Sequence, residues 1–244
     1  MKALIFAAGL GTRLKPLTDT MPKAMVPIKG KPLLEHQIMK LKASGFDHLV
    51  INVHHFADQI VDFLRENDNF GLKIDISDER DLLLETGGGV KHAAHFFADK
   101  EPFLIHNVDI LSNVDLQKFY AENAQKAKVS LLVNERKTSR YLLFDEAKRL
   151  VGWTNMQTGE VKSPFPNLDV DKCEKYAFSG IQLFSPEIFP LMDSSFGAKF
   201  SIIDFYLSIA DKVEIKAVVD KNLQLLDIGK LDTLQMAEEV ISCL

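Results

Sequence analysis

Glycines and cations lie close together near the start of the chain, in a pattern that suits phosphate binding. A short apolar run is followed by Gly9 and Gly11, then by Arg13 and, after a proline, Lys23. Glycines let the backbone approach a ligand and direct successive N–H groups at oxyanions. An arginine can make a forked contact to a phosphate, and a lysine adds a mobile positive charge. The alternative interpretation is the ordinary turn after the first strand of an α/β protein.

Two familiar glycine-loop motifs are excluded by the residues themselves. A dinucleotide-binding loop needs a third glycine three residues after Gly11, and Leu14 occupies that position. The GxxxxGK[ST] pattern of a P-loop is also absent. Two interpretations of this segment therefore remain, which are a phosphate loop of another type and a simple turn.

The elements around this loop predict an α/β fold. The apolar run at 2–7 is typical of a strand that is covered on both faces. Strands and helices alternate after it, whereas strands with short connections dominate the second half. We expect a single-domain, Rossmann-like, mixed and mostly parallel β-sheet flanked by helices. The expected strands are 2–7, 48–53, 72–79, 103–111, 129–134, 140–145, 149–153, 176–184 and 213–219, and the expected helices are 32–45, 58–67, 89–98, 115–127, 186–192, 201–211 and 231–243.

Composition and charge argue against several classes of function. The chain has 244 residues, a net charge of −5 and no long basic run, so nucleic acid is not an expected partner. No stretch approaches the roughly 18 apolar residues of a membrane span, and the N-terminus lacks the features of a signal peptide. The two cysteines have no metal-binding spacing. We expect a cytoplasmic monomer or homodimer with no membrane partner.

Five segments resemble one family. "AAGLGTRLKPLT" followed by "MPKAMVPI" (7–28) is similar to the N-terminal signature of the sugar-1-phosphate nucleotidylyltransferases. Four later segments resemble elements of that family in the same order. They are "LLETGGGVKHA" (83–93), "HNVDIL" (106–111), "FSGI" (178–181) and "LLDIGK" (225–230).

The resemblance implies transfer of a nucleotidyl group from a nucleoside triphosphate to a sugar 1-phosphate, with release of pyrophosphate. The attacking phosphate is largely ionised at neutral pH, since its second pKa is about 6, so no general base is needed. The family's catalytic positions correspond to Arg13, Lys23 and Asp109. Asp109 and Asp227 correspond to ligands of Mg²⁺, the implied cofactor. Lys23 is expected beside the α-phosphate and Arg13 beside the β- and γ-phosphates.

The resemblance also divides a nucleotidyltransferase domain over 1–244 into a nucleotide-binding half, about 1–111, and a sugar-binding half, about 112–244. Gly180 corresponds to a strand that lines the sugar pocket. Arg140 is either a contact to the sugar substrate or a plain surface arginine. The implied nucleotide-binding residues are Ala7, Ala8, Gly9, Gly11, Thr12, Arg13, Lys23, Gly87, Gly88 and Asn107.

One departure from the family pattern lies beside Asp109, and another indicates a branch. Val108 replaces the glycine that usually precedes the magnesium aspartate, which would strain the backbone if that position needs a positive φ. The "EKP" element of many glucose-1-phosphate enzymes is missing, and "VGWTNMQTGE" (151–160) stands in its place. This pattern is closest to N-acetylmuramate-1-phosphate uridylyltransferases, so UTP and N-acetylmuramate 1-phosphate are the expected substrates.

Three alternatives stay open. Guanylyltransferases for mannose 1-phosphate or heptose 1-phosphate lie near this branch. Cytidylyl transfer to phosphocholine shares the loop, but it would call for an aromatic cage, and the chain has one Trp and four Tyr without such a cluster. A sugar-nucleotide-binding regulatory subunit without catalysis is the alternative from another class, and Val108 motivates it.

Other polar residues are expected to be structural. His54 and His55 directly follow the expected strand 48–53, where adjacent side chains of extended backbone point to opposite faces and do not readily chelate one ion, so a strand-end or loop role is expected. The segment 79–81 is expected to be a solvated loop.

Overall fold

The computed structural model describes residues 1–240, whose contacts group into two compact units. The first unit contains Met1–Leu83, Phe103–Phe119 and the chain from Gln224 on, and the second contains Leu84–Pro102 and Tyr120–Leu223. Each unit therefore combines segments that are distant in the sequence. None of the helices in the described part of the chain is both long and apolar enough to cross a membrane. A single domain over 1–244 stays a prediction.

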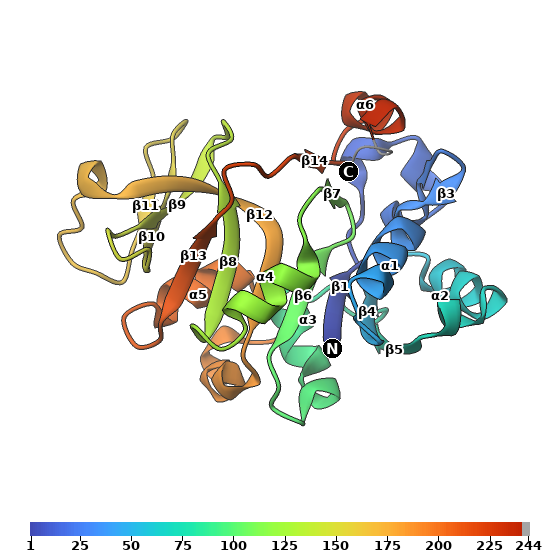
Figure 1. The fold of residues 1–244 in the computed structure, drawn as a ribbon, viewed down its shortest axis with the longest axis horizontal. Coiled ribbons are helices and arrows are strands. Elements are labelled where there is room, and N and C mark those ends of the chain that lie inside the picture. Colours follow the sequence, from blue (N-terminus) through green and yellow to red (C-terminus); the bar gives the residue numbers. More distant parts are fainter. Residues whose placement is uncertain (241–244) are drawn as a thin grey trace. The chain divides into compact units, whose positions relative to one another are not determined.

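A parallel sheet forms the centre of the first unit (Figure 1). Its strand order is β6 (Phe103–Asn107), β1 (Lys2–Phe6), β4 (His48–Val53) and β5 (Lys73–Asp78), and each neighbouring pair is parallel. The carboxyl ends of these strands therefore lie along the same edge of the sheet. Loops that follow all four strands can meet at that edge.

The burial of these strands explains their composition. Ala3, Leu4 and Ile5 of β1 are completely buried, as is the central part of β4. A parallel strand covered on both faces needs apolar residues at successive positions, which is the pattern that predicts it. Helix α1 (Leu33–Ala43) buries Leu34, Ile38 and Leu41 on one face, as the sequence periodicity predicts.

Two two-stranded sheets and further helices complete the first unit. The pair β2 (Pro27–Ile28) with β3 (Lys31–Pro32) and the pair β7 (Ile110–Ser112) with β14 (Leu225–Asp227) are antiparallel. The helices are α2 (Ala57–Glu66), α6 (Leu231–Val240) and the 3-10 helices η1 (Thr12–Leu14), η2 (Leu17–Asp19), η3 (Lys23–Met25) and η4 (Asp68–Gly71).

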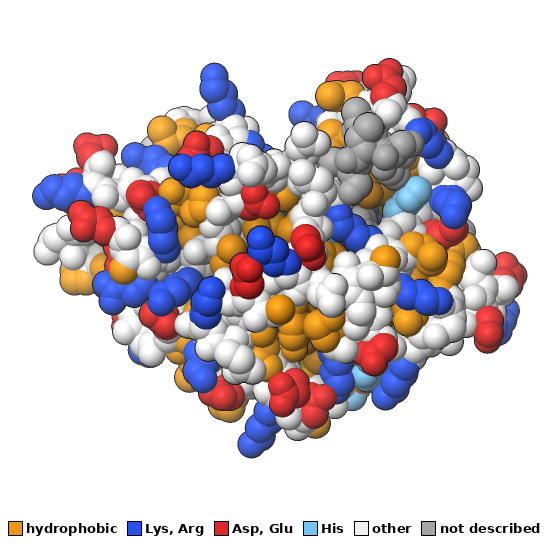
Figure 2. Space-filling view, viewed as in Figure 1, with side chains coloured by type: hydrophobic (Ala, Val, Ile, Leu, Met, Phe, Trp, Pro, Cys, Tyr) orange, Lys and Arg blue, Asp and Glu red, His pale blue; other side chains and the backbone are white. Residues whose placement is uncertain are grey.

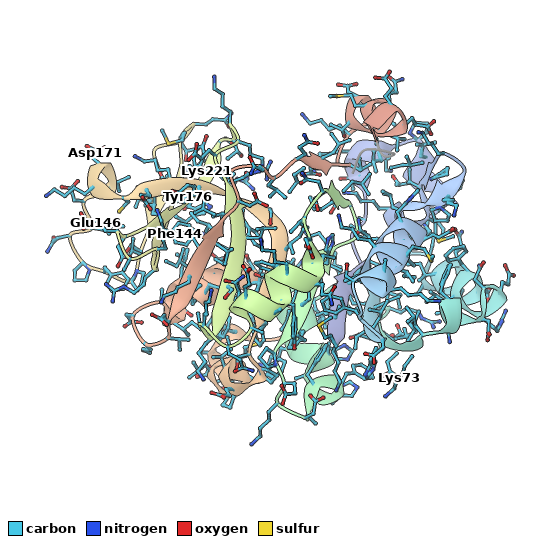
Figure 3. The ribbon with its side chains drawn as sticks, in the orientation of Figure 1. Lys73, Phe144, Glu146, Asp171, Tyr176 and Lys221 are labelled. Atoms are coloured by element: carbon cyan, nitrogen blue, oxygen red, sulfur yellow. The ribbon has the colours of Figure 1, made fainter. Side chains whose placement is uncertain are left out.

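The second unit is built mainly on antiparallel pairing. Six strands, whose residue ranges close this paragraph, are hydrogen-bonded in the spatial order β11, β10, β9, β12, β8 and β13. The pair formed by β8 and β13 is parallel, and the other neighbouring pairs are antiparallel. Phe144 and Tyr176 face each other from β9 and β12, with ring centroids 6.0 Å apart (Figure 3). The strands are β8 (Val129–Asn134), β9 (Arg140–Phe144), β10 (Leu150–Asn155), β11 (Val161–Lys162), β12 (Glu174–Phe184) and β13 (Ile215–Val219).

The helices of this unit are α3 (Glu85–His92), α5 (Ile202–Ile209) and the 3-10 helices η5 (Ala93–Phe97), η6 (Val170–Lys172), η7 (Pro186–Leu191) and η8 (Ser194–Phe196). Helix α4 (Leu116–Asn123) crosses the boundary between the units.

The predicted α/β fold class with a mixed sheet is confirmed, and three local predictions need correction. The expected strand 103–111 is divided, because β6 ends at Asn107 and β7 leaves to pair with β14. The glycine triplet lies inside α3 rather than before it. The short strands β2, β3 and β14 were not expected, since two or three residues carry no periodicity. The expected end of the last helix, 241–243, lies outside the described residues.

A completely buried histidine lies in β6. The Nδ1 atom of His106 is 2.8 Å from the carbonyl oxygen of Asn107, and its Nε2 atom has no hydrogen-bond partner. Burial lowers the pKa of His106 from 6.5 to about 4, because the apolar surroundings disfavour the charged ring. The hydrogen bond to Asn107 opposes this shift.

We expect His106 to make the protein less stable as the pH falls from 6.5 to about 4. In this window the unfolded chain binds a proton at His106 that the folded chain does not bind, whereas above pH 6.5 both states are neutral. The shift corresponds to at most about 3 kcal/mol of unfolding free energy. Urea unfolding at several pH values would show a shallower loss of stability in His106→Gln than in the wild-type protein.

The matched control is His95→Gln, since His95 is exposed. Its unfolding curves should follow the wild-type curves at every pH. Equal pH dependence in the wild type and His106→Gln would contradict the burial argument.

Candidate active site

The loop after β1 requires glycine at one of its two glycine positions. Gly11 has φ +62°, and a Cβ atom there would lie 2.8 Å from Thr18 Cγ2 and 3.0 Å from Lys23 Cβ. The Thr18 hydroxyl donates to the Gly11 carbonyl over 2.9 Å. Gly9 is exposed, and a Cβ atom on it would meet nothing within 4 Å. The chain therefore folds back tightly at Gly11 and brings Lys23 beside the loop.

Lys23 and Asp109 form an ion pair in this region. Asp109 follows β6, and the Lys23 ammonium donates to its Oδ2 atom. Lys23 is only 8% exposed, so its charge lies mostly out of water. A buried ammonium is costly unless a carboxylate or another anion compensates it. The two residues with the most specific predicted roles are thus partners of each other in the structure.

The pairing of β7 with β14 places the backbone of Asp227 beside that of Asp109, the other predicted metal ligand. Asp227 is in register with Ile110, the residue after Asp109. The Ile228 N–H donates to the Asp109 carbonyl over 2.8 Å. Residues 109 and 227 are far apart in sequence, and this short antiparallel ladder places their backbones side by side.

Arg13 and Asp227 meet at Gly229. A Cβ atom on Gly229 would lie 2.7 Å from Arg13 Nη2 and 2.9 Å from Asp227 Oδ1. Any larger residue would force the guanidinium or the carboxylate to move. Sequence reasoning missed this residue, although the glycine of "LLDIGK" was part of the quoted motif. Gly11, Arg13, Lys23, Asp109 and Asp227 are therefore brought together within the first unit.

Two polar side chains of α1 support the β7 segment. Gln37 donates through Nε2 to the Ile110 carbonyl, and Lys40 donates to the Ser112 carbonyl. Burial lowers the pKa of Lys40 from 10.5 to about 8, and the nearby Asp115 opposes this shift. The sequence analysis did not single out either residue. The sequence does indicate that Gln37 is buried, because this polar residue lies between Leu34 and Leu41 on the apolar face of the helix.

Val108 and Asn107 lie directly before Asp109. Val108 is not among the residues with positive φ, so the substitution of the family glycine causes no backbone strain. Val108 is buried, and its N–H donates to the Phe6 carbonyl over 3.1 Å. Asn107 ends β6 and is half-buried. Its contact with a nucleotide stays a prediction.

The glycines of "LLETGGG" have a packing role within the second unit. The Gly87 and Gly88 N–H groups donate to the Phe200 carbonyl over 2.8 and 3.2 Å. A Cβ atom on Gly87 would overlap the Phe200 ring, and one on Gly88 would overlap the Ala198 carbonyl. Close approach of helix α3 to the 198–200 segment therefore requires both glycines. Their predicted contact with the nucleotide stays a prediction.

The two sugar-site candidates lie in different local environments. Gly180 is buried in β12 with φ +79°, at an irregularity in the pairing with β8, so the backbone there requires glycine. Arg140 is exposed at the start of β9. Arg136, which the sequence analysis did not consider, donates through Nη2 to the Phe178 carbonyl over 2.8 Å. The roles of Arg140 and Gly180 toward a sugar stay predictions.

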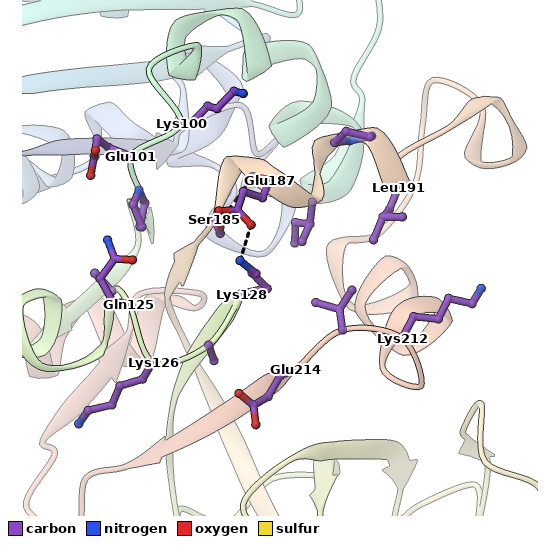
Figure 4. A pocket seen from close by; sticks show the side chains of 16 residues that line it. Lys100, Glu101, Gln125, Lys126, Lys128, Ser185, Glu187, Leu191, Lys212 and Glu214 are labelled. Atoms are coloured by element: carbon purple, nitrogen blue, oxygen red, sulfur yellow. Dashed lines mark hydrogen bonds and ion pairs between the residues drawn. The ribbon is translucent and has the colours of Figure 1, made fainter.

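A cavity of about 650 Å³ in the second unit has no predicted site residue in its lining (Figure 4). Its charged residues have mixed signs, and Lys128 pairs with Glu187 across it. Figure 2 likewise shows charges of both signs interspersed over the face in view. The charged residues that line the cavity are Lys100, Glu101, Lys126, Lys128, Glu187, Lys212 and Glu214.

Residues 2–241 match a protein family described as "Nucleotidyl transferase". An N-acetylmuramate α-1-phosphate uridylyltransferase of Neisseria meningitidis serogroup B is 31% identical over 82% of this chain and 82% of its own length. The same enzyme of Caulobacter vibrioides is 46% identical, over 44% of this chain and 45% of that protein. The solved structure of HddC from Yersinia pseudotuberculosis, complexed with GMP-PN, is 26% identical and covers 98% of both chains with a TM-score of 0.76.

The family match and the similarity to HddC extend over almost all of the chain and agree with the motifs that its sequence carries. The prediction of a sugar-1-phosphate nucleotidyltransferase type of enzyme is confirmed at the level of the family. The chain belongs to the nucleotidyl transferase family.

Proposed function

We propose that the protein transfers a uridylyl group from UTP to N-acetylmuramate 1-phosphate, giving the UDP-sugar and pyrophosphate. The observation that carries the reaction class is the Lys23–Asp109 ion pair beside the tight turn at Gly11. The names of the Neisseria and Caulobacter relatives support the choice of nucleotide and sugar.

The residues around the pair suit charge neutralisation. Two polyanions must approach each other in this reaction, so positioning and positive charge are the main requirements. Lys23 would neutralise the α-phosphate as charge develops in the transition state. Arg13, with the N–H groups of Gly11 and Thr12, would bind the β- and γ-phosphates. No side chain has to accept a proton from the sugar phosphate, since that group is already ionised.

Asp109 and Asp227 suit magnesium. Mg²⁺ prefers hard oxygen ligands and is commonly bound by one or two carboxylates, with waters and substrate phosphates completing its coordination. Asp227, the last residue of β14, and Asp109, directly before β7, would supply two such carboxylates. Among the described residues no group of three or more His, Cys, Asp or Glu side chains could hold a metal without further ligands. The bound ion would supply further positive charge to the phosphates.

The ion pair implies an exchange of partners on binding. In the structure Lys23 and Asp109 compensate each other. When substrates bind, Lys23 would pass to the phosphate while the Asp109 carboxylate turns to the cation. Each buried charge therefore has a partner before and after binding, which avoids the cost of an isolated buried ion.

A guanylyl transfer is the second candidate, since the HddC structure contains GMP-PN and matches nearly the whole chain. A panel of UTP, GTP, dTTP and CTP against N-acetylmuramate, mannose and glucose 1-phosphates separates the candidates when pyrophosphate release is measured. We expect UTP with N-acetylmuramate 1-phosphate to give the highest kcat/KM. Turnover of GTP with mannose 1-phosphate and none of UTP would contradict the proposal. Nucleotide binding without turnover of any pair would favour a regulatory subunit.

Substitution of the paired residues should affect the chemical step. Lys23→Ala and Asp109→Asn should each reduce kcat by about 10²- to 10³-fold, since Lys23 would act on the reacting phosphates and Asp109 would hold the cation that acts on them. Steady-state pyrophosphate release measures this effect, and circular dichroism checks the fold. Lys31→Ala is the matched control, because Lys31 is exposed and pairs only with Glu35 among the described contacts. Near-normal kcat in Lys23→Ala would remove Lys23 from the mechanism.

Metal binding to the nucleotide-free protein tests the exchange of partners separately from activity. Calorimetric titration with Mn²⁺, as a probe for Mg²⁺, should show binding weakened about tenfold or more in Asp227→Asn. Lys23→Met should bind Mn²⁺ more tightly than the wild type, because the Asp109 carboxylate then lacks its competing ammonium. Unchanged or weaker Mn²⁺ binding in Lys23→Met would contradict the exchange.

A further inference from the structure

A buried asparagine holds the start of the phosphate loop. The Asn52 Oδ1 atom accepts hydrogen bonds from the Ala7 and Ala8 N–H groups over 2.6 and 3.2 Å. Asn52 belongs to β4, is in register with Phe6 at the end of β1, and is 3% exposed. Its side chain thus binds the two N–H groups that come directly after the end of β1.

The asparagine is oriented in turn by a buried glutamate. Asn52 Nδ2 donates to Glu79 Oε1 over 2.8 Å, and Glu79 is 3% exposed. The Glu79 N–H donates to the Val53 carbonyl over 2.8 Å, and the Glu79 carbonyl lies 2.7 Å from His54 Nδ1. The expectation of a solvated loop at 79–81 is therefore wrong for Glu79. Its position after β5 places it at the same sheet edge as Asn52 and the loop.

The direction of these hydrogen bonds is determined by the groups themselves. The backbone N–H groups of Ala7 and Ala8 can only donate, so the amide oxygen of Asn52 must face them. The amide nitrogen must then face Glu79, and this Nδ2 atom donates to Glu79 Oε1. The three strand ends of β1, β4 and β5 are connected by a single chain of donors and acceptors. An exchange of Asn52 for aspartate would therefore mismatch a donor and an acceptor, and an exchange of Glu79 for glutamine would require its amide to rotate.

We propose that Asn52 and Glu79 are positioning residues for the triphosphate loop. They hold Ala7 and Ala8 so that the backbone from Gly9 to Arg13 has its binding conformation before a nucleotide arrives. Preorganised donors bind a phosphate without the cost of ordering the loop. The N–H groups of Ala7 and Ala8 are already engaged by Asn52, so a nucleotide meets other groups of this segment. This inference rests on the proposed nucleotidyl transfer.

A swap of acid and amide tests the pair. In Asn52→Asp one carboxylate oxygen still accepts from Ala7 and Ala8, but the other faces the Glu79 carboxylate. The introduced carboxylate has no amide N–H to donate to Glu79 Oε1 and brings a negative charge into a buried site, so the loop is no longer held in place. In the double variant Asn52→Asp/Glu79→Gln, the introduced amide donates to the introduced carboxylate and restores the chain of hydrogen bonds. Glu79→Gln alone keeps an acceptor for Asn52 Nδ2 after its amide rotates.

We expect Asn52→Asp to weaken nucleotide binding about ten- to hundredfold, the range that a mismatched buried polar group can cause. Calorimetry with UTP, and with GTP in parallel, measures this effect, and steady-state kinetics compares KM for nucleotide with KM for sugar phosphate. The KM for nucleotide should rise much more than the KM for sugar phosphate. The double variant should recover most of the lost affinity, and Glu79→Gln should remain close to the wild type.

Ile51→Val is the matched control for loss of stability. Ile51 is completely buried on the same strand, and its truncation removes packing without touching the hydrogen bonds to the loop. It should lower the Tm and leave nucleotide binding unchanged. If Asn52→Asp also lowers only the Tm, or if the double variant fails to recover affinity, the pair has no positioning role, while the proposed function stands. A wild-type protein that binds neither UTP nor GTP would overturn both.

Discussion

Compensation of buried charge is the constraint on which the site depends. An ammonium that is almost completely buried, as in Lys23, needs an anion, and Asp109 provides it. The tight turn at Gly11 brings the lysine back to the loop after β1, and the end of β6 delivers the aspartate. The local fold therefore holds two opposite charges close together at the end of the parallel sheet.

The parallel sheet makes this arrangement possible. In a parallel sheet the carboxyl ends of all strands lie at one edge, where ligands commonly bind in open α/β folds. The strand ends contribute the glycine loop after β1, Asn52 in β4, Glu79 after β5 and Asp109 after β6. At this shared edge Asn52 contacts both the start of the loop and Glu79, and Asp109 contacts Lys23. The antiparallel pairing of β7 with β14 then adds Asp227 from a distant part of the chain.

Small residues serve close approach at several points. Gly11 lies against Thr18 and Lys23, and Gly229 lies between Arg13 and Asp227. In the second unit, Gly87 and Gly88 let helix α3 approach Phe200 and Ala198. A motif rich in glycine invites interpretation as a ligand loop, but the N–H groups of Gly87 and Gly88 are engaged by a backbone carbonyl. Packing therefore accounts for part of a pattern that the sequence alone connects with ligand binding.

The sequence by itself determined the order of strands and helices, the glycine turn and the family. These properties follow from local periodicity and from contiguous motifs, and the predicted strands 48–53 and 129–134 agree with β4 and β8. Tertiary structure alone decided which distant residues became partners. Asn52 and Glu79 are ordinary polar residues in the chain, and β14 is too short to show a period. Their contacts arise because β1, β4 and β5 end at one edge and because β7 pairs with β14. Such contacts depend on register and burial, which a local pattern does not contain.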